Sequence, residues 1–315
     1  HKLNEIKALC SNATILRLGK KVDSVKVEEE STQSLAAMMM GKELKDIQHP
    51  EKSELGEVRL SLKGLDMPAK DKTGISLKAM NLDVYAGEVV GISGVAGNGQ
   101  DELLAALNGE QRCVQASSIE IEGKAAGRMS PNERRLTGLA SVPEKRLGHG
   151  AVPDMDLVEN AFLTAFKRLG LIKSGLIDKM QTTHFAEKII QGFSVKTPGS
   201  DVPAASLSGG NLQKFIIGRE LLQNPDILIV AQPTWGVDAG AAQTIRQELR
   251  ELAAKGAAVL VISQDLDELL EISDRIGAIC GGRLSKFYQT SEITTEQVGM
   301  LMAGVCLEEG VLNVA

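Results

Sequence analysis

Residues Leu207 to Lys214 read Leu-Ser-Gly-Gly-Asn-Leu-Gln-Lys, a turn that runs into an amphipathic stretch. Apolar residues then recur at helical spacing, which places Ser208, Gly209 and Gly210 at the N-terminus of a helix. Free backbone amides and the helix dipole attract anions at such a terminus, and glycine lets a phosphate approach closely. An ordinary N-cap and turn is the alternative explanation of the same residues.

A second glycine-rich stretch follows a short apolar strand and precedes another helical pattern. Its Gly94 and Gly99 fit the G-x-x-x-x-G spacing of a phosphate-binding loop, which needs this strand–loop–helix context. The next two residues are Gln100 and Asp101, where such a loop has a lysine and a hydroxyl residue. A structural turn between a strand and a helix is the alternative here.

The composition limits the class of protein. A chain of 315 residues that is 43% hydrophobic and 24% charged suits a globular protein with a full core. The net charge of −6 and the aromatic content of 3% argue against nucleic-acid binding and against a polybasic membrane patch. No run of about 18 apolar residues predicts a membrane span, and no signal peptide is recognisable.

The four cysteines, Cys10, Cys113, Cys280 and Cys306, are far apart and form no CxxC pair. We therefore expect core thiols in a reducing compartment rather than disulfides. The four histidines are equally scattered, so no metal site is predicted from them.

The beginning of the chain repeats its end. Residues 1–44 align with residues 264–307 without a gap, at a constant offset of 263, and Gly19 falls on Gly282. This register predicts two copies of one domain, with residues 1–44 as the C-terminal tail of a first copy whose body is missing. The tail is expected to form a helix, a hairpin around Gly19 and a second helix.

The second copy is expected at residues 57–304, after a linker at 45–56 and before a C-terminal tail at 305–315. Strands are predicted at 57–67, 76–84, 89–92, 227–230 and 259–263. Residues 152–206 are predicted to be mainly helical, with the clearest helix at 160–169.

Together these motifs resemble the nucleotide-binding domain of ABC ATPases. More narrowly, the chain resembles the second half of the double-cassette ATP-binding proteins that drive import of simple sugars and nucleosides. The resemblance rests on the stretches 91–100, 142–144, 207–213 and 229–234. It implies an α/β, P-loop NTPase-like fold with a mixed or parallel sheet core, a helical subdomain at about 152–206 and an N-terminal antiparallel β part.

The resemblance also implies the site residues. The nucleotide-binding set is Gly94, Gly97, Asn98, Gly99, Gln100, Asp101, Glu144, Gln232, Asp238 and Gln264. The signature motif is Leu207, Ser208, Gly209, Gly210, Asn211 and Gln213. Five positions lack the group that the family usually carries, namely Gln100, Asp101, Ala231, Gln232 and Gln264. His1 aligns with Gln264 in the repeat, and it is predicted to be the switch histidine of the first copy.

These replacements predict that the two functional faces of the cassette, its own nucleotide site and its signature motif, have different functions. The cassette's own site is expected to be weak or inactive, because Gln100 removes a cation and Gln232 removes a carboxylate base. Its signature motif is expected to complete a composite site with the first cassette, where ATP and Mg²⁺ bind. Transmembrane permease subunits and, indirectly, a solute-binding protein are the other implied partners. The implied location is the cytoplasmic face of the membrane. Trp235 is predicted to lie in the core or in an interface.

Two other interpretations remain open. The five replaced groups also suit a non-hydrolysing module that uses the cassette fold for dimerisation and docking. A soluble ABC ATPase of translation or DNA repair usually has two complete sites and basic surfaces, and the acidic net charge argues against it.

Overall fold

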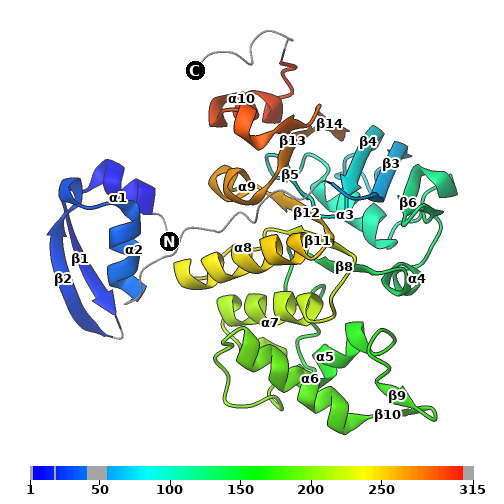
Figure 1. The fold of residues 1–315 in the computed structure, drawn as a ribbon, viewed down its shortest axis with the longest axis horizontal. Helices are drawn as coiled ribbons and strands as arrows, with labels where there is room; N and C mark the ends of the chain where they lie inside the picture. The colour runs from blue at the N-terminus through cyan, green and yellow to red at the C-terminus, as the bar shows by residue number, and fades with distance from the viewer. Residues whose placement is uncertain (1–2, 18, 41–54, 308–315) are drawn as a thin grey trace.

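The computed structural model describes residues 3–17, 19–40 and 55–307. His1, most of the expected linker and the last eight residues lie outside the described residues. A larger body holds residues 55–307, and a small helix–hairpin–helix unit holds residues 3–40 (Figure 1).

A parallel sheet forms the centre of the larger body. Its strands are β5 (Val89–Ser93), β8 (Leu139–Val142), β11 (Ile227–Ala231), β12 (Ala258–Ser263) and β13 (Arg275–Cys280). They lie in the order β13-β5-β12-β11-β8, and all neighbouring pairs are parallel. Two short strands, β14 (Arg283–Leu284) and β15 (Tyr288–Gln289), pair antiparallel with β13. The carboxyl ends of the parallel strands therefore share one edge, where open α/β sheets bind ligands.

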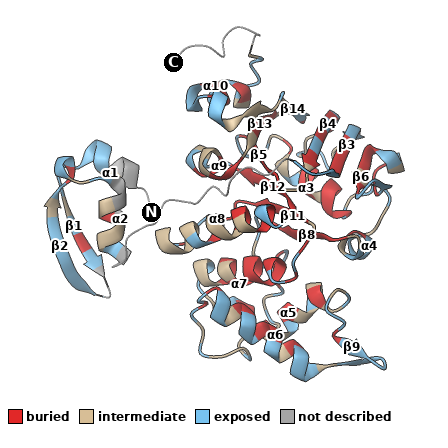
Figure 2. Ribbon diagram, in the orientation of Figure 1, coloured by how far each residue is buried: buried red, intermediate tan, exposed pale blue. Residues whose placement is uncertain are grey.

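Both faces of this sheet are covered. Helices α7 (Gly209–Leu221), α8 (Ala239–Ala254), α9 (Leu266–Ile272) and α10 (Thr295–Met302) contribute to one core. The other core holds α3 (Gln100–Asn108) and an antiparallel sheet of β3 (Val58–Met67), β4 (Leu77–Tyr85), β6 (Ile119–Ile121) and β7 (Lys124–Ala125). Val261 belongs to the first core and Leu260 to the second, as the alternation of side chains along a strand requires. Figure 2 shows buried residues along the central strands.

The helical subdomain consists of α5 (Leu157–Ala165) and α6 (Lys179–Gly192), which pack against α7. The helix expected at 160–169 begins earlier, because Asp156 and Glu159 form a capping box at its start. It ends at Ala165, and a small hairpin of β9 (Ile172–Lys173) and β10 (Leu176–Ile177) follows. A further short helix, α4 (Pro131–Leu136), precedes β8.

The small unit repeats the end of the larger body in structure as well as in sequence. It consists of α1 (Leu3–Leu9), β1 (Asn12–Arg17), β2 (Lys20–Lys26) and α2 (Thr32–Met40). Adding 263 to the bounds of α1 gives 266–272, the bounds of α9, and adding 263 to those of β1 gives 275–280, the bounds of β13. The start of α2 likewise falls on the start of α10.

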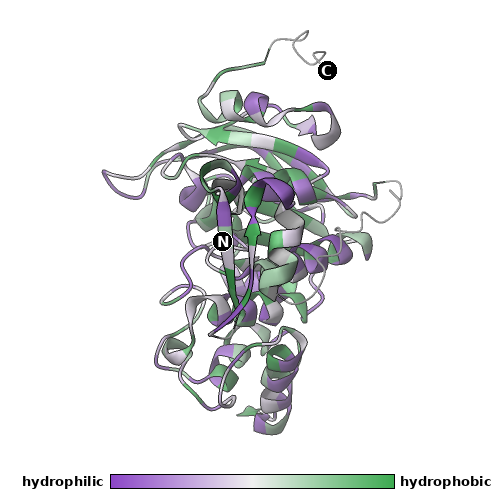
Figure 3. Ribbon diagram, turned by 90° about the vertical axis from the view of Figure 1, so that its left-hand side faces the viewer, coloured by the Kyte–Doolittle hydropathy of each residue, from purple (hydrophilic) through white to green (hydrophobic). Residues whose placement is uncertain are grey.

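Some sequence predictions were wrong. Cys10 and Cys306 are exposed, so they are not core thiols, although Cys113 is buried and all four cysteines are free. Trp235 is 67% exposed, which excludes the core, and its place in an interface stays a prediction. Apolar and polar residues are interleaved along the helices (Figure 3), and no helix among the described residues is long and apolar enough to span a membrane.

Candidate nucleotide cleft and signature turn

A cleft of about 1050 Å³ opens at the carboxyl ends of β5, β8, β11 and β12. Nine of the predicted site residues line it: Gly94, Gly97, Gln100, Asp101, Glu144, Leu207, Gly209, Gln232 and Gln264. The remaining predicted residues of the described chain are Asn98, Gly99, Ser208, Gly210, Asn211, Gln213 and Asp238, and they do not line the cleft. The parallel strands thus bring together segments that are up to 170 residues apart (264 − 94 = 170).

The glycine-rich loop between β5 and α3 has the backbone that a phosphate cradle needs. Gly97 has a φ of +80°, and no atom lies within 4 Å of the place that a Cβ would take. The loop is therefore open to a ligand at this point. Gly99 is the N-cap of α3 in the left-handed region, and a Cβ there would lie 3.3 Å from the Cα atom of Gly282. Only glycine meets both conditions at Gly99.

The side chain of Gln100 folds back onto this loop. Its Oε1 accepts a hydrogen bond of 2.9 Å from the backbone N–H of Asn98, and its Nε2 donates to the carbonyl of Val95 at 2.9 Å. The Nδ2 of Asn98 donates to the same carbonyl, and the Asn98 Oδ1 accepts from the N–H of Gly281. A loop amide that could bind phosphate is thus already paired within the protein.

Two carboxylates face this loop. Asp101 lies in the first turn of α3 and Glu144 follows β8, and both line the cleft. Partial desolvation raises the pKa of Glu144, although the residue is exposed, and the negative charge of Asp101 raises it further. These two carboxylates therefore lie in the cleft where an anionic ligand would bind, although Lys70, Lys145 and Arg146 line the same cleft.

The end of β11 supplies an amide instead of carboxylates. Gln232 has a φ of +49°, a strained value for a residue with a Cβ. Its Oε1 lies 3.3 Å from the hydroxyl of Ser263. Ala231, where the resemblance places a Mg²⁺-binding aspartate, has no side-chain oxygen. The donor set at this strand end therefore does not fit Mg²⁺.

Glu268 was missed by the sequence analysis. It is 1% exposed, and burial raises its pKa. Its Oε2 lies 2.9 Å from the hydroxyl of Ser263, which donates its one proton either to Glu268 or to Gln232, so one serine lies between the two side chains. Since Glu268 lies in the first turn of α9, its acidic character alone marks only a favourable helix start.

The signature turn forms the N-terminus of α7. Ser208 is the N-cap residue, and both Ser208 and Gly209 are exposed. The Asn211 Nδ2 donates to the Ser208 hydroxyl at 2.9 Å, and the Asn211 Oδ1 accepts from the N–H of Lys196 at 2.9 Å. Asn211 thereby fixes a hydroxyl next to backbone amides that have no partner inside the helix. This arrangement is suited to an anion.

Two more predicted residues have structural roles. Gln213 is buried, and its Nε2 donates to the carbonyl of Pro233 at 3.0 Å, so it connects α7 to the segment after β11. Asp238 is the N-cap of α8 and accepts from the N–H of Ala241 at 3.0 Å. For Asp238, a contact with nucleotide stays a prediction.

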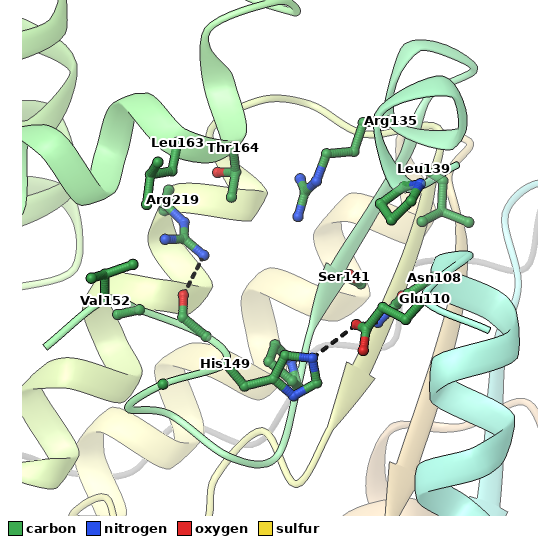
Figure 4. A pocket seen from close by; sticks show the side chains of 15 residues that line it. Asn108, Glu110, Arg135, Leu139, Ser141, His149, Val152, Leu163, Thr164 and Arg219 are labelled. Atoms are coloured by element: carbon green, nitrogen blue, oxygen red, sulfur yellow. Dashed lines mark hydrogen bonds and ion pairs between the residues drawn. The ribbon is translucent and has the colours of Figure 1, made fainter. Parts of the chain in front are cut away.

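A second, smaller cavity of about 230 Å³ lies between the helical subdomain and the sheet. Figure 4 shows Leu163 and Thr164 of α5 on one side and Asn108 at the end of α3 on the other. The His149 Nε2 lies 2.8 Å from the Glu110 Oε1 at its rim. The loop after β8, helix α5 and the end of α3 all line this cavity.

The fold and the cleft define an α/β P-loop NTPase of the nucleotide-binding-cassette type, which confirms the fold class expected from the sequence. The family model described as "ABC transporter" matches residues 77–235, half of the chain, and the chain belongs to this family. A similar solved structure is the dimeric, post-hydrolysis state of the ATP-binding cassette MJ0796 bound to ADP and Pi. Its TM-score is 0.63 at 22% identity, over 73% of this chain and 98% of that one.

Curated relatives are more similar in sequence. The nucleoside import ATP-binding protein NupA of Lactococcus lactis is 37% identical over 98% of this chain and 61% of its own length. The guanosine import ATP-binding protein NupO of Bacillus subtilis is 36% identical over 96% of this chain and 59% of its own length. The glucose import ATP-binding protein TsgD13 of Haloferax volcanii is 35% identical over 96% of this chain and 55% of its own length. The chain thus spans somewhat more than half the length of these relatives.

Proposed function

We propose that this chain is the second cassette, with the tail of the first, of an ATP-binding subunit that powers import of simple sugars or nucleosides. The observation that carries the proposal is the signature turn, which exposes Ser208 and Gly209 at the N-terminus of α7 beside a cleft with altered chemistry. Relatives named for nucleoside, guanosine and glucose import support the class of solute.

The cassette's own cleft is proposed to bind nucleotide weakly or to hold it without hydrolysis. The pairing of Gln100 with the Asn98 amide supports this, because a phosphate must first displace that hydrogen bond. The carboxylates of Asp101 and Glu144 repel a triphosphate. Gln232 carries no charge and is a poor general base.

The productive site is proposed to be composite. Ser208 and the first amides of α7 bind the terminal phosphate of an ATP that the first cassette holds, with His1 as the switch residue of that cassette. Mg²⁺-bound ATP supplies the phosphoryl group and the metal charge there. The matching elements of residues 3–40 and 266–302 support the presence of a first cassette.

The partners follow from the same proposal. Permease subunits dock at the cavity of Figure 4, where the exposed Leu163 offers apolar surface and the hydrogen-bonded side chains of His149 and Glu110 offer polar groups. A solute-binding protein acts on the permease and so only indirectly on this chain. The protein lies at the cytoplasmic face of the membrane and binds no nucleic acid, in keeping with its net charge of −6.

A non-hydrolysing docking module is the second candidate. The observation that favours it is the same loop, whose side chains satisfy one another without a ligand. In that case the cassette fold serves only for dimerisation and for docking on the permease.

ATP hydrolysis by the longer protein that contains both cassettes distinguishes the two functions. Ser208→Arg should lower turnover by about 100-fold or more, since it places a long side chain where the phosphate binds. Phosphate release is the measurement. Ser117→Arg, at an exposed serine outside the cleft, is the matched control and should keep normal turnover. Full activity of Ser208→Arg, or no hydrolysis by the unmodified protein, would instead support the docking module.

A further inference from the structure

The loop after β8 is a compact turn held by its own backbone. The N–H of Gly150 donates to the carbonyl of Lys145 at 3.0 Å, and the N–H of Ala151 donates to that of Arg146 at 2.7 Å. The buried Arg219 of α7 adds a hydrogen bond from its Nη2 to the carbonyl of Gly150 at 2.8 Å. Because the turn is paired in this way, the direction of the Arg146 side chain is well defined.

Arg146 joins this turn to two segments far away in sequence. Its Nε donates to the Oε1 of the buried Gln213 at 2.9 Å, one turn into α7. Its Nη2 donates to the carbonyl of Trp235, in the segment that follows β11. Gln213 in turn donates to the carbonyl of Pro233 in that same segment. Arg146, Gln213 and the segment after β11 are therefore all connected by hydrogen bonds. The planar guanidinium, with its fork of donors, can serve two acceptors at once, whereas an ammonium has no such fixed geometry.

Two glycines leave room for this guanidinium. A Cβ on Gly209 would lie 2.7 Å from the Nη1 of Arg146, and a Cβ on Gly236 would lie 3.3 Å from its Nη2. Gly209 therefore has a packing role in addition to any contact with phosphate. The guanidinium lies directly against the backbone of the signature turn.

We infer that Arg146 is the positioning residue that fixes the signature turn relative to the sheet. The inference rests on the proposed function, in which the signature turn completes a composite ATP site. The loop also lines the cavity proposed for the permease, through Gly148, His149 and Gly150.

Hydrogen exchange of the present chain tests the positioning role without ATP. The reporter is the Leu212 amide, which donates to the carbonyl of Ser208 at 2.9 Å. Arg146→Met should raise its exchange rate about tenfold, because a charge-assisted contact that orders the turn is lost. The control is Arg128→Met, which removes an exposed arginine that donates to the carbonyl of Val114. Equal exchange at Leu212 in the two variants would overturn the inference.

A double-mutant cycle tests the contact itself. Gly209→Ala should accelerate exchange at Leu212 in the chain with Arg146, because the new methyl group meets the guanidinium. In an Arg146→Ala background the same substitution should have less than half of that effect. Gly192→Ala, where no atom lies within 4 Å of the new Cβ, should show no such dependence on Arg146. Additive effects of Gly209→Ala and Arg146→Ala would contradict the contact.

Turnover of the longer two-cassette protein tests the consequence for the reaction. Arg146→Met should lower kcat about tenfold and leave KM for ATP nearly unchanged, since the signature turn then orders less well around the transition state. Arg146→Lys should recover only part of kcat. If the unmodified protein hydrolyses ATP and Arg146→Met retains its kcat, the inference fails while the proposed function stands. If the unmodified protein does not hydrolyse ATP, the proposed function fails, and the exchange experiments still decide whether Arg146 holds the turn.

Discussion

Asp101 and Glu144 face a cleft whose expected ligand is an anion. The raised pKa of Glu144 gives this repulsion a pH dependence. As the pH falls towards that raised pKa, Glu144 takes up a proton, and one negative charge disappears from the cleft. The phosphates of a nucleotide then meet less repulsion. Affinity for nucleotide should therefore rise on acidification, earlier than a carboxyl with an ordinary pKa of 4.5 would allow.

Titration with ADP at about pH 7.5 and about pH 5.5 checks this expectation. The exposed Trp235 lines the cleft and is the only tryptophan, so its fluorescence reports binding. The unmodified chain should gain several-fold in affinity at the lower pH relative to Glu144→Gln. Glu144→Gln should also bind more tightly than the unmodified chain at the higher pH. Identical pH profiles of the two proteins would show that Glu144 does not govern the repulsion.

The signature helix α7 depends on a buried group of charges. Glu220 is fully buried, with its Oε2 at 2.7 Å from the Arg135 Nη1 and its Oε1 at 2.8 Å from the Arg219 Nε. Glu220→Gln leaves two arginines without their anion, and breaking such a buried pair costs about 3 kcal/mol. Urea unfolding should show this loss. Glu187→Gln, on the exposed face of α6, should leave the unfolding free energy within about 0.5 kcal/mol of the unmodified value.

The helices and strands also show how much of the fold could be predicted from the sequence. Buried strands such as β11 and β12 were located within one residue, because their apolar runs and flanking turns are local signals. The hairpin of β9 and β10 was missed, since strands of two residues carry no alternation. The contacts of Arg146 were missed as well, because Gln213 and Trp235 are 67 and 89 residues away in sequence. A charged turn with distant partners looks like any solvated turn until the chain is folded.

Across the whole molecule, the two copies of the repeat differ in how far their equivalent apolar side chains are exposed. Leu9 is 82% exposed and Leu16 is 66% exposed, whereas their counterparts at the 263 offset, Ile272 and Ile279, are fully buried. Apolar side chains at equivalent places in equivalent elements should have equivalent surroundings in complete domains. The exposure of Leu9 and Leu16 is therefore the feature expected if residues 3–40 belong to a first cassette that is not in this chain.

This proposal predicts that one substitution is tolerated in the present chain and destabilises the longer protein. Leu16→Asp should leave the thermal midpoint of the present chain nearly unchanged, because the side chain is exposed. In the longer protein that contains the first cassette, the aspartate would be buried without a partner, and stability should fall by about 3 kcal/mol. Calorimetric scans of both proteins provide the measurement. Leu136→Asp, at an exposed leucine outside the repeat, is the control and should be tolerated in both. If the longer protein tolerates Leu16→Asp equally well, residues 3–40 do not complete a first cassette, and the composite site at Ser208 loses its proposed partner.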